Sequence, residues 1–240
     1  MNLWRWLIVL LPLPVLAASL EAGVDALARQ DFATALKEFR PLAEQGNVVA
    51  QVNLGNLYMK GAGVAQDYAE ARRWFLQAAA QNEPMAEAKL GILYYYGLGL
   101  KKNSAEAASW FRKAAEQGNP TAQAILASLH AAGDGVPRDN VMAYYWYSRA
   151  AEAGNEDAAA GRASLEEEIS PGDRDEALRL LAEVRKAAEE KDQQALEALS
   201  GVPAQAGEKA IKPHSASGHR SRHTKPHRKR HSKPASRSHR

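Results

Sequence analysis

The stretch LGNLYMKGAGVAQDYAEARRWFLQAA at residues 54–79 recurs twice at a spacing of 36 residues. It returns as LGILYYYGLGLKKNSAEAASWFRKAA at residues 90–115 and as LASLHAAGDGVPRDNVMAYYWYSRAA at residues 126–151. A fixed period of this length is the signature of a repeat protein, in which each unit buries its apolar face against the next one. The sequence therefore predicts three strong units, at residues 48–83, 84–119 and 120–155.

Each unit is expected to be a pair of helices joined by a loop that contains paired glycines. Before the loop, Ala50, Leu54 and Leu57 are spaced to form one apolar helical stripe. After it, Trp74 lies among alanines spaced for a second stripe, and small alanines let helices approach closely around one large side chain. We therefore expect the tryptophan column, with Trp110 at its centre, to be core rather than a binding surface.

The residues between the stripes are typical of helix ends. Asp67 and Asn103 each stand three residues before a glutamate, which is the spacing of a capping box. Asn47 can cap the first helix of its unit, as can the asparagines at the same position in later units. Asn82 replaces a glycine that would end a helix in the left-handed conformation, which asparagine also tolerates.

The repeat domain is expected to cover residues 18–199 and to end in two degenerate units, at residues 20–47 and 156–199. In the last unit, the sequence Ser-Pro-Gly-Asp at residues 170–173 replaces the glycine loop, and a more charged helix is predicted over residues 174–199. Atypical end units are expected where a stack of repeats must stop against water.

Residues 1–17 have the composition of a secretory signal. One basic residue, Arg5, precedes a ten-residue apolar run at residues 7–16, and small residues follow, which predicts cleavage before Ala18. The run is shorter than the ~20 apolar residues that a spanning helix needs, so no stable membrane span is expected. The expected location is periplasmic or secreted.

A set of spaced residues in the first strong unit carries a resemblance to a known family: Leu54, Gly55, Tyr58, Gly61, Gly63, Val64, Asp67, Ala71, Trp74, Ala78 and Ala79. With the period of 36 residues, this set resembles the Sel-one-like repeat family, a relative of the tetratricopeptide repeats. The resemblance implies an all-α fold, a right-handed α/α superhelix (solenoid) of stacked antiparallel helix pairs. For an exported bacterial-type member it also implies an adaptor role without catalysis, in which the protein acts as a scaffold, a regulator of signalling proteins or a helper of envelope machinery.

The sequence offers few candidate catalytic residues. The chain has no cysteine, and His130 is the one histidine outside the last 32 residues. We expect His130 to be a partly buried helical residue, and we expect no catalytic residue and no cofactor. The Gly61-Ala62-Gly63 loop lacks the third glycine of a nucleotide-binding fingerprint and follows no strand. An envelope enzyme acting on peptidoglycan, or its accessory subunit, is the alternative to the adaptor.

The C-terminal residues 200–240 form a basic tail, predicted to be disordered because it has no aromatic and almost no aliphatic residue to bury in a core. Residues 209–240 hold 11 of the 31 Lys and Arg residues and none of the 28 acidic residues. Charge without aromatic residues predicts salt-sensitive binding to an anionic envelope polymer, with nucleic acid a less expected partner behind a signal. The residues expected to bind this polyanion are Arg220, Arg222, Lys225, Arg228, Lys229, Arg230, Lys233 and Arg237.

Histidines in the same tail recur every four residues and leave a metal site open as an alternative. They are His219, His223, His227 and His231. Pro226 interrupts a regular helix there, and the surrounding positive charge opposes cation binding, so no metal is the favoured prediction. Nucleic-acid binding through this tail is the other alternative.

The resemblance to tetratricopeptide-like stacks implies that the first helices line a concave groove, and a protein or peptide partner is expected there. Residues two positions beyond the apolar stripe are expected to face away from the core, which makes Val52, Asn56 and Met59 an exposed stripe that recurs in later units. Exposed aromatic and apolar side chains are typical of binding hot spots. We call the following set the groove residues: Asn56, Met59, Lys60, Ile92, Tyr95, Tyr96 and Ser128.

Overall fold

The computed structural model describes residues 13–200, which fold into helices and contain no strand within that range. Residues 1–12 of the predicted signal and residues 201–240 of the basic tail lie outside the described residues. The helices are α1 (Leu13–Ala28), α2 (Phe32–Glu44), α3 (Val48–Lys60), α4 (Tyr68–Ala79), α5 (Pro84–Tyr96), α6 (Ser104–Glu116), α7 (Pro120–Ala132), α8 (Asn140–Glu152), α9 (Glu156–Glu166) and α10 (Pro171–Ser200).

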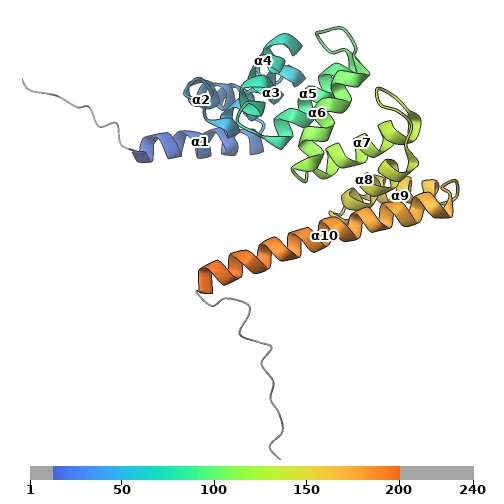
Figure 1. Cartoon of the computed structure of the whole chain (residues 1–240). Helices are drawn as coiled ribbons and strands as arrows, with labels where there is room; N and C mark the ends of the chain where they lie inside the picture. The colour runs from blue at the N-terminus through green and yellow to red at the C-terminus, as the bar shows by residue number, and fades with distance from the viewer. Residues whose placement is uncertain (1–12, 201–240) are drawn as a thin grey trace, which may run out of the picture. The chain divides into compact units, whose positions relative to one another are not determined.

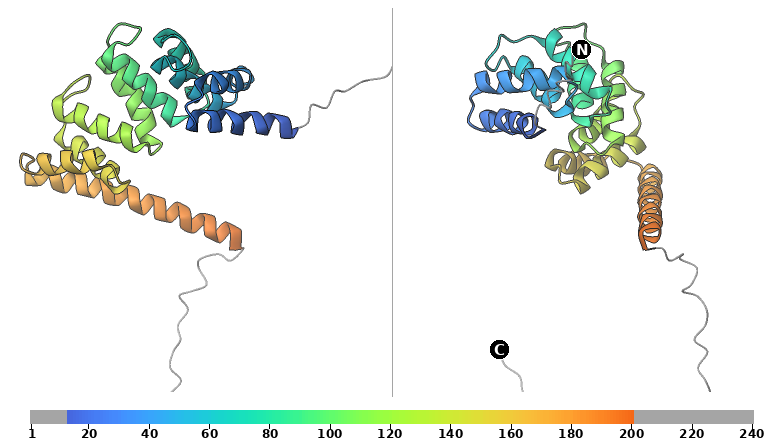
Figure 2. Two further views of the ribbon diagram at one scale, coloured as in Figure 1. Left: turned by 180° about the vertical axis from the view of Figure 1, so that it is seen from behind. Right: turned by 90° about the vertical axis from the view of Figure 1, so that its left-hand side faces the viewer.

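The chain divides into two compact units, residues 1–191 and residues 192–240. Within the first unit, each helix from α1 to α9 packs mainly against the helices before and after it in the chain, so that helix pairs stack one after another (Figure 1). The view from behind shows the same succession of pairs (Figure 2). This arrangement confirms the predicted all-α fold of stacked helix pairs. Of the second unit, the structure describes residues 192–200, the end of α10.

The helix ends follow the predicted signals. The side chain of Asn47 accepts a hydrogen bond from the Ala50 amide at 3.0 Å and starts α3. Gly61 ends that helix with φ of +68°, a conformation that costs an L-residue more than it costs glycine. Asn82 takes the same left-handed region, with φ of 59°, as predicted. Asp67 caps α4, but the reciprocal half of the capping box is missing, because Glu70 pairs with Arg73 instead.

The largest fully buried side chains are Phe39, Phe75 and Phe111, and the last two directly follow tryptophans in the sequence. Phe75 and Phe111 are at most 1% exposed and pack against glycines of their partner helices. A Cβ atom on Gly55 would lie 2.6 Å from Phe75 Cε1, so the glycine makes room for the ring. In the third strong unit Ala127 replaces this glycine, and Tyr147 instead lies against Gly161 of α9.

The tryptophan column is only partly core. Trp74 and Trp146 are 3% and 5% exposed, as predicted, but Trp110 is only half-buried, which corrects the expectation that it fills the central core position. The buried phenylalanines take the core, so each indole lies at its edge, where the surroundings differ. Trp74 joins a core cluster with residues of α2, and Trp146 joins one that includes Leu181 of α10, whereas Trp110 packs at the margin of its cluster.

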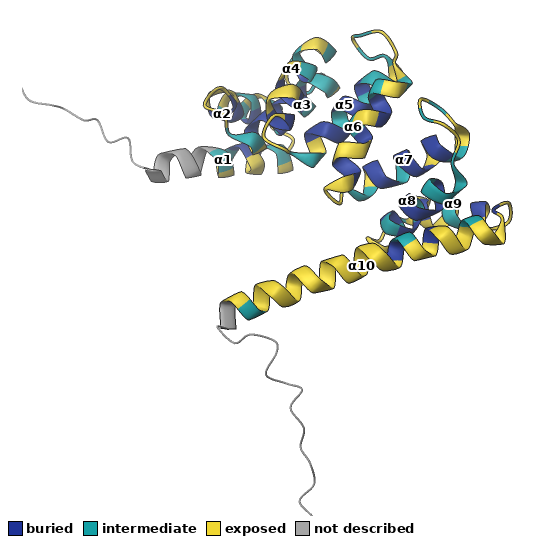
Figure 3. Ribbon diagram, in the orientation of Figure 1, coloured by how far each residue is buried: buried dark blue, intermediate teal, exposed yellow. Residues whose placement is uncertain are grey.

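The last helix begins earlier than predicted. Pro171 is its first residue, and the side chain of Ser170 accepts a hydrogen bond from the Asp173 amide at 3.1 Å, so residues 170–173 are a helix start rather than a loop. Proline is well suited to a first helical position because its missing amide has no partner there. Ala177 and Leu181 are buried, while most of α10 is exposed (Figure 3). No helix among the described residues has the length and apolarity to cross a membrane.

Candidate functional site

The expected exposed stripe of the first helices α3, α5 and α7 is largely covered. Val52 is 7% exposed, and Met59, Ile92 and Tyr95 are half-buried against the core clusters that join adjacent units. The expectation of full exposure was wrong because each first helix in a stack has neighbours on two sides. The second helix of the same unit covers one stripe of the first helix, and the adjoining unit covers part of the neighbouring stripe.

Three groove residues are accessible, and one of the half-buried residues is polar. Lys60, Tyr96 and Ser128 are exposed, and Tyr96 is 67% exposed. Asn56 is half-buried, and its Oδ1 atom is buried without a hydrogen-bond partner in the described part of the chain. The binding role of this set stays a prediction.

Tyr95 connects its own unit to the next. Its ring makes an edge contact with Tyr96 at 5.0 Å between centroids, and the Lys102 ammonium lies 5.1 Å from the ring centre. A hydrogen bond with Asp134, in the glycine loop of the following unit, raises the pKa of the Tyr95 hydroxyl. Tyr95 is therefore an inter-unit contact as well as a groove residue, and Tyr96 is the more accessible of the two.

Lys89 in the middle of α5 was not predicted as a site residue. Burial lowers the pKa of its ammonium, and the nearby positive charge of Lys60 lowers it further. Neither lysine forms an ion pair with any residue that the structure describes. The sequence could have indicated Lys89, because it is a charged residue at a repeat position where the neighbouring units have the uncharged Asn53 and Ile125.

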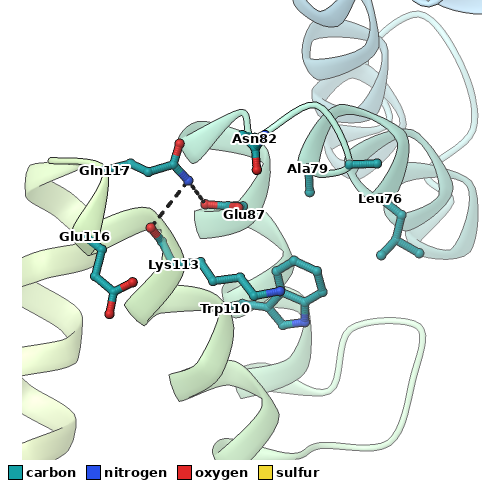
Figure 4. A pocket seen from close by; sticks show the side chains of 9 residues that line it. Leu76, Ala79, Asn82, Glu87, Trp110, Lys113, Glu116 and Gln117 are labelled. Atoms are coloured by element: carbon teal, nitrogen blue, oxygen red, sulfur yellow. Dashed lines mark hydrogen bonds between the residues drawn. The ribbon is translucent and has the colours of Figure 1, made fainter.

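A separate pocket of about 760 Å³ lies between the second helices α4 and α6, beside the start of α5 (Figure 4). Apolar atoms of α4 and the indole of α6 form its walls, and polar side chains gather at one end. Its lining residues are Leu76, Ala79, Ala80, Asn82, Glu87, Trp110, Lys113, Glu116 and Gln117.

Glu87 is the buried acid of this pocket and is only 3% exposed. The Gln117 side-chain amide donates a hydrogen bond to Glu87 Oε2 at 2.5 Å (Figure 4). Burial raises the pKa of the Glu87 carboxyl, and the negative charges of Glu83 and Glu116 act in the same direction. Lys113 and the Gln117 hydrogen bond oppose this shift.

The indole of Trp110 forms the apolar side of the pocket. Its Nε1 atom donates a hydrogen bond to Glu106 Oε1 at 3.0 Å. The Lys113 ammonium lies 4.2 Å from the ring centre, which is a cation–π contact. The pocket therefore has an aromatic face that already holds an ammonium group. Sequence reasoning missed it because Trp110 was assigned to the core.

The remaining predicted chemistry is not assembled into a site by the described residues. His130 is 6% exposed on α7, which confirms a buried helical histidine. No cluster of three or more histidine, aspartate or glutamate side chains that could hold a metal occurs within the described part of the chain. The tail histidines and the tail arginines and lysines lie outside the described residues.

The described residues form a helical-repeat fold, and comparison with known proteins agrees with this fold class. Residues 48–83, 84–119 and 120–155 each match the Sel1 repeat, at the boundaries that the period predicted. The chain therefore contains three Sel1 repeats, which confirms the resemblance found in the sequence. Sel1-repeat proteins are generally protein-interaction modules.

Two similar proteins of known structure agree with the Sel1 repeats found in the sequence. A protective antigen of uropathogenic Escherichia coli with an SLR fold is 44% identical, with a TM-score of 0.56, over 58% of this chain and 31% of its own. A Sel1 repeat protein from Oxalobacter formigenes is 36% identical, with a TM-score of 0.56, over 58% of each chain. This chain thus spans about a third and somewhat more than half of these two relatives. Cysteine-rich protein B of Helicobacter pylori is 20% identical over 61% of this chain and 93% of its own, with a TM-score of 0.41. The comparison with curated proteins found no match.

Proposed function

We propose that this protein is a non-enzymatic scaffold of the cell envelope that holds a polypeptide partner along its first helices. Its basic tail would bind an anionic envelope polymer. The periplasm or the cell exterior is the expected location, because residues 1–17 have the composition of a cleaved secretory signal.

The proposal of a polypeptide partner is supported mainly by the exposed aromatic and charged side chains on the first helices. Tyr96 is 67% exposed beside Tyr95, and exposed aromatic side chains are enriched where protein partners bind. Lys60 and Lys89 add two positive charges that have no ion-pair partner among the described residues. A partner segment with an aromatic or aliphatic anchor and a nearby carboxylate would complement this surface.

The charge distribution of the sequence supports the second half of the proposal. The tail residues 209–240 hold 11 Lys and Arg residues with no acid, while all 28 acidic residues precede them. A polyanion would gain affinity from counterion release on meeting this tail, with little dependence on its detailed chemistry.

The test is capture of partners from an envelope extract by the purified full chain. The variant Tyr96→Ser combined with Lys60→Ala removes the accessible aromatic ring and one unpaired charge of the groove. Both positions are solvent-exposed, so the helical signal should be unchanged while capture falls by about tenfold or more.

The matched control is Leu178→Ser, which removes another exposed apolar side chain, 46% exposed on α10. This control should capture as well as the unaltered chain. A protein retained equally by the groove variant and the unaltered chain would contradict the groove assignment. Recovery of the chain from cytosol with an intact Met1 would contradict the envelope location.

A further inference from the structure

Two junctions between units share a buried polar contact that recurs with the repeat. The side-chain amide of Gln51 donates to the Ala43 carbonyl at 3.1 Å, where α2 meets α3. Seventy-two residues later, the amide of Gln123 donates to the Ala115 carbonyl at 2.9 Å, where α6 meets α7. Each glutamine thus supplies a donor to the last turn of the preceding helix, whose carbonyls lack helical partners.

The junction between α4 and α5 lies between these two junctions and has a glutamate at the position where the other two have a glutamine. Glu87 stands 36 residues from Gln51 and from Gln123, and its ionised carboxylate has no hydrogen to donate. The equivalent carbonyl, that of Ala79, accepts from the Asn82 amide at 3.0 Å, and no described side chain donates to it. Ala79 and Glu87 both line the pocket between α4 and α6. The pocket therefore presents two acceptors where the flanking junctions have an acceptor and a donor.

We propose that this pocket binds an arginine or lysine side chain of a partner polypeptide, with Glu87 and the Ala79 carbonyl as acceptors for its cationic head. The inference rests on the proposed function only in taking the partner to be a polypeptide. It adds a second contact surface, on the second helices, to the groove residues of the first helices.

The rest of the pocket fits the stem of such a side chain. Leu76 is 40% exposed and Trp110 half-buried, so both can cover the methylene groups that a basic side chain carries. The Lys113 ammonium lies 4.2 Å from the centre of the Trp110 ring, so an incoming basic side chain would have to displace Lys113 for its stem to pack on that face. Glu87 forms no ion pair among the described residues, and a bound cation would offset part of the free-energy cost of burying its carboxylate.

The charge state of Glu87 sets the pH dependence of this binding. Burial raises the pKa of Glu87, with Glu83 and Glu116 acting in the same direction and Lys113 opposing them. A protonated Glu87 loses the negative charge that would attract a cationic head. Affinity for a basic side chain should therefore fall as the pH falls through this raised pKa.

The experiment titrates the full chain at pH 7 with the peptide acetyl-Gly-Arg-Gly-amide and follows backbone amide resonances of α4 and α6. The peptide with citrulline in place of arginine has nearly the same shape without the charge. The variant Glu87→Gln gives the middle junction the amide of its neighbours, so it should fold at least as well as the unaltered chain. It should bind the arginine peptide at least about tenfold more weakly, because a charge-assisted hydrogen bond is replaced by an internal one.

The control variant is Glu44→Gln, which removes an exposed carboxylate at the end of α2 and should leave the affinity unchanged. Equal binding by Glu87→Gln, or equal binding of the citrulline peptide, would overturn the proposal. So would the absence of any shift at millimolar arginine peptide. If envelope partners are still captured through Tyr96 in that case, the scaffold function stands and only the pocket assignment fails.

Discussion

Positions that recur every 36 residues carry the most information at the scale of single residues, above all where one unit departs from the others. Gln51, Glu87 and Gln123 form one such column, and the departure at Glu87 marks the pocket. Tyr58, Tyr94 and His130 form another. The Arg40 guanidinium donates to the Tyr58 hydroxyl at 2.9 Å, and 72 residues later Arg112 acts electrostatically on His130. These columns are visible in the sequence, but which member is buried depends on the adjoining unit.

Replacing His130 should alter the pH dependence of stability. Burial lowers the pKa of His130 below its ordinary 6.5, Arg112 acts in the same direction, and Asp139 and the Pro137 carbonyl oppose them. The folded chain therefore binds fewer protons here than the unfolded chain, and the stability associated with neutral His130 is lost as the pH falls below about 6.5. His130→Tyr restores the residue of the other two units and should remove this loss. Urea unfolding at pH 7.5 and pH 5.5 measures it, because the difference between variant and unaltered chain should grow at the lower pH. A difference that does not change with pH would contradict a buried neutral imidazole.

At the scale of helices, the sequence predicted which segments are helical and where most of them end. Asparagine and aspartate caps and left-handed glycines are local signals, so Asn47, Asp67 and Gly61 could be assigned without knowledge of their neighbours. The burial of a side chain, by contrast, depends on the helices of the neighbouring unit. Met59 and Tyr95 looked exposed on an isolated helix and are half-buried in the stack, and Trp110 looked buried and lines a pocket. The start of α10 at Pro171 was missed because proline and glycine there were interpreted as a loop.

The packing between paired helices predicts that Phe111 contributes more to stability than the adjacent Trp110, although the sequence assigned Trp110 to the core. Phe111 is 1% exposed and lies against Gly91 of the partner helix, so Phe111→Ala should cost about 3–5 kcal/mol of unfolding free energy. Trp110→Ala removes a half-buried ring that borders solvent and should cost about 1–2 kcal/mol. Urea unfolding of both variants, followed by far-ultraviolet circular dichroism, provides the comparison. The packing argument fails if Trp110→Ala is the more destabilising of the two.

At the scale of the whole molecule, the sequence joins a net acidic repeat region to a strongly basic tail. The overall net charge of +3 hides this division. The repeat region offers two surfaces of different chemistry, a groove face with Lys60 and Lys89 and a pocket with Glu87. Under the two proposals, a polypeptide with an acidic segment and a basic side chain would engage both surfaces, and the tail would bind a polyanion.

The tail's part can be separated from that of the repeats by its response to salt and pH. Binding of the full chain to an acidic polysaccharide should weaken steeply between 50 and 200 mM salt, by about tenfold or more, because each released counterion adds to the salt dependence. Deleting residues 209–240 should abolish it, whereas Glu87→Gln should leave it unchanged. Between pH 7 and pH 5.5 binding should strengthen, since the six tail histidines gain charge near an ordinary pKa of about 6.5. A variant with these histidines replaced by glutamine keeps the fixed charges and should lose only the pH response. Binding that does not change with salt concentration and is abolished by a chelator would instead identify metal ligands in the tail, namely His219, His223, His227 and His231.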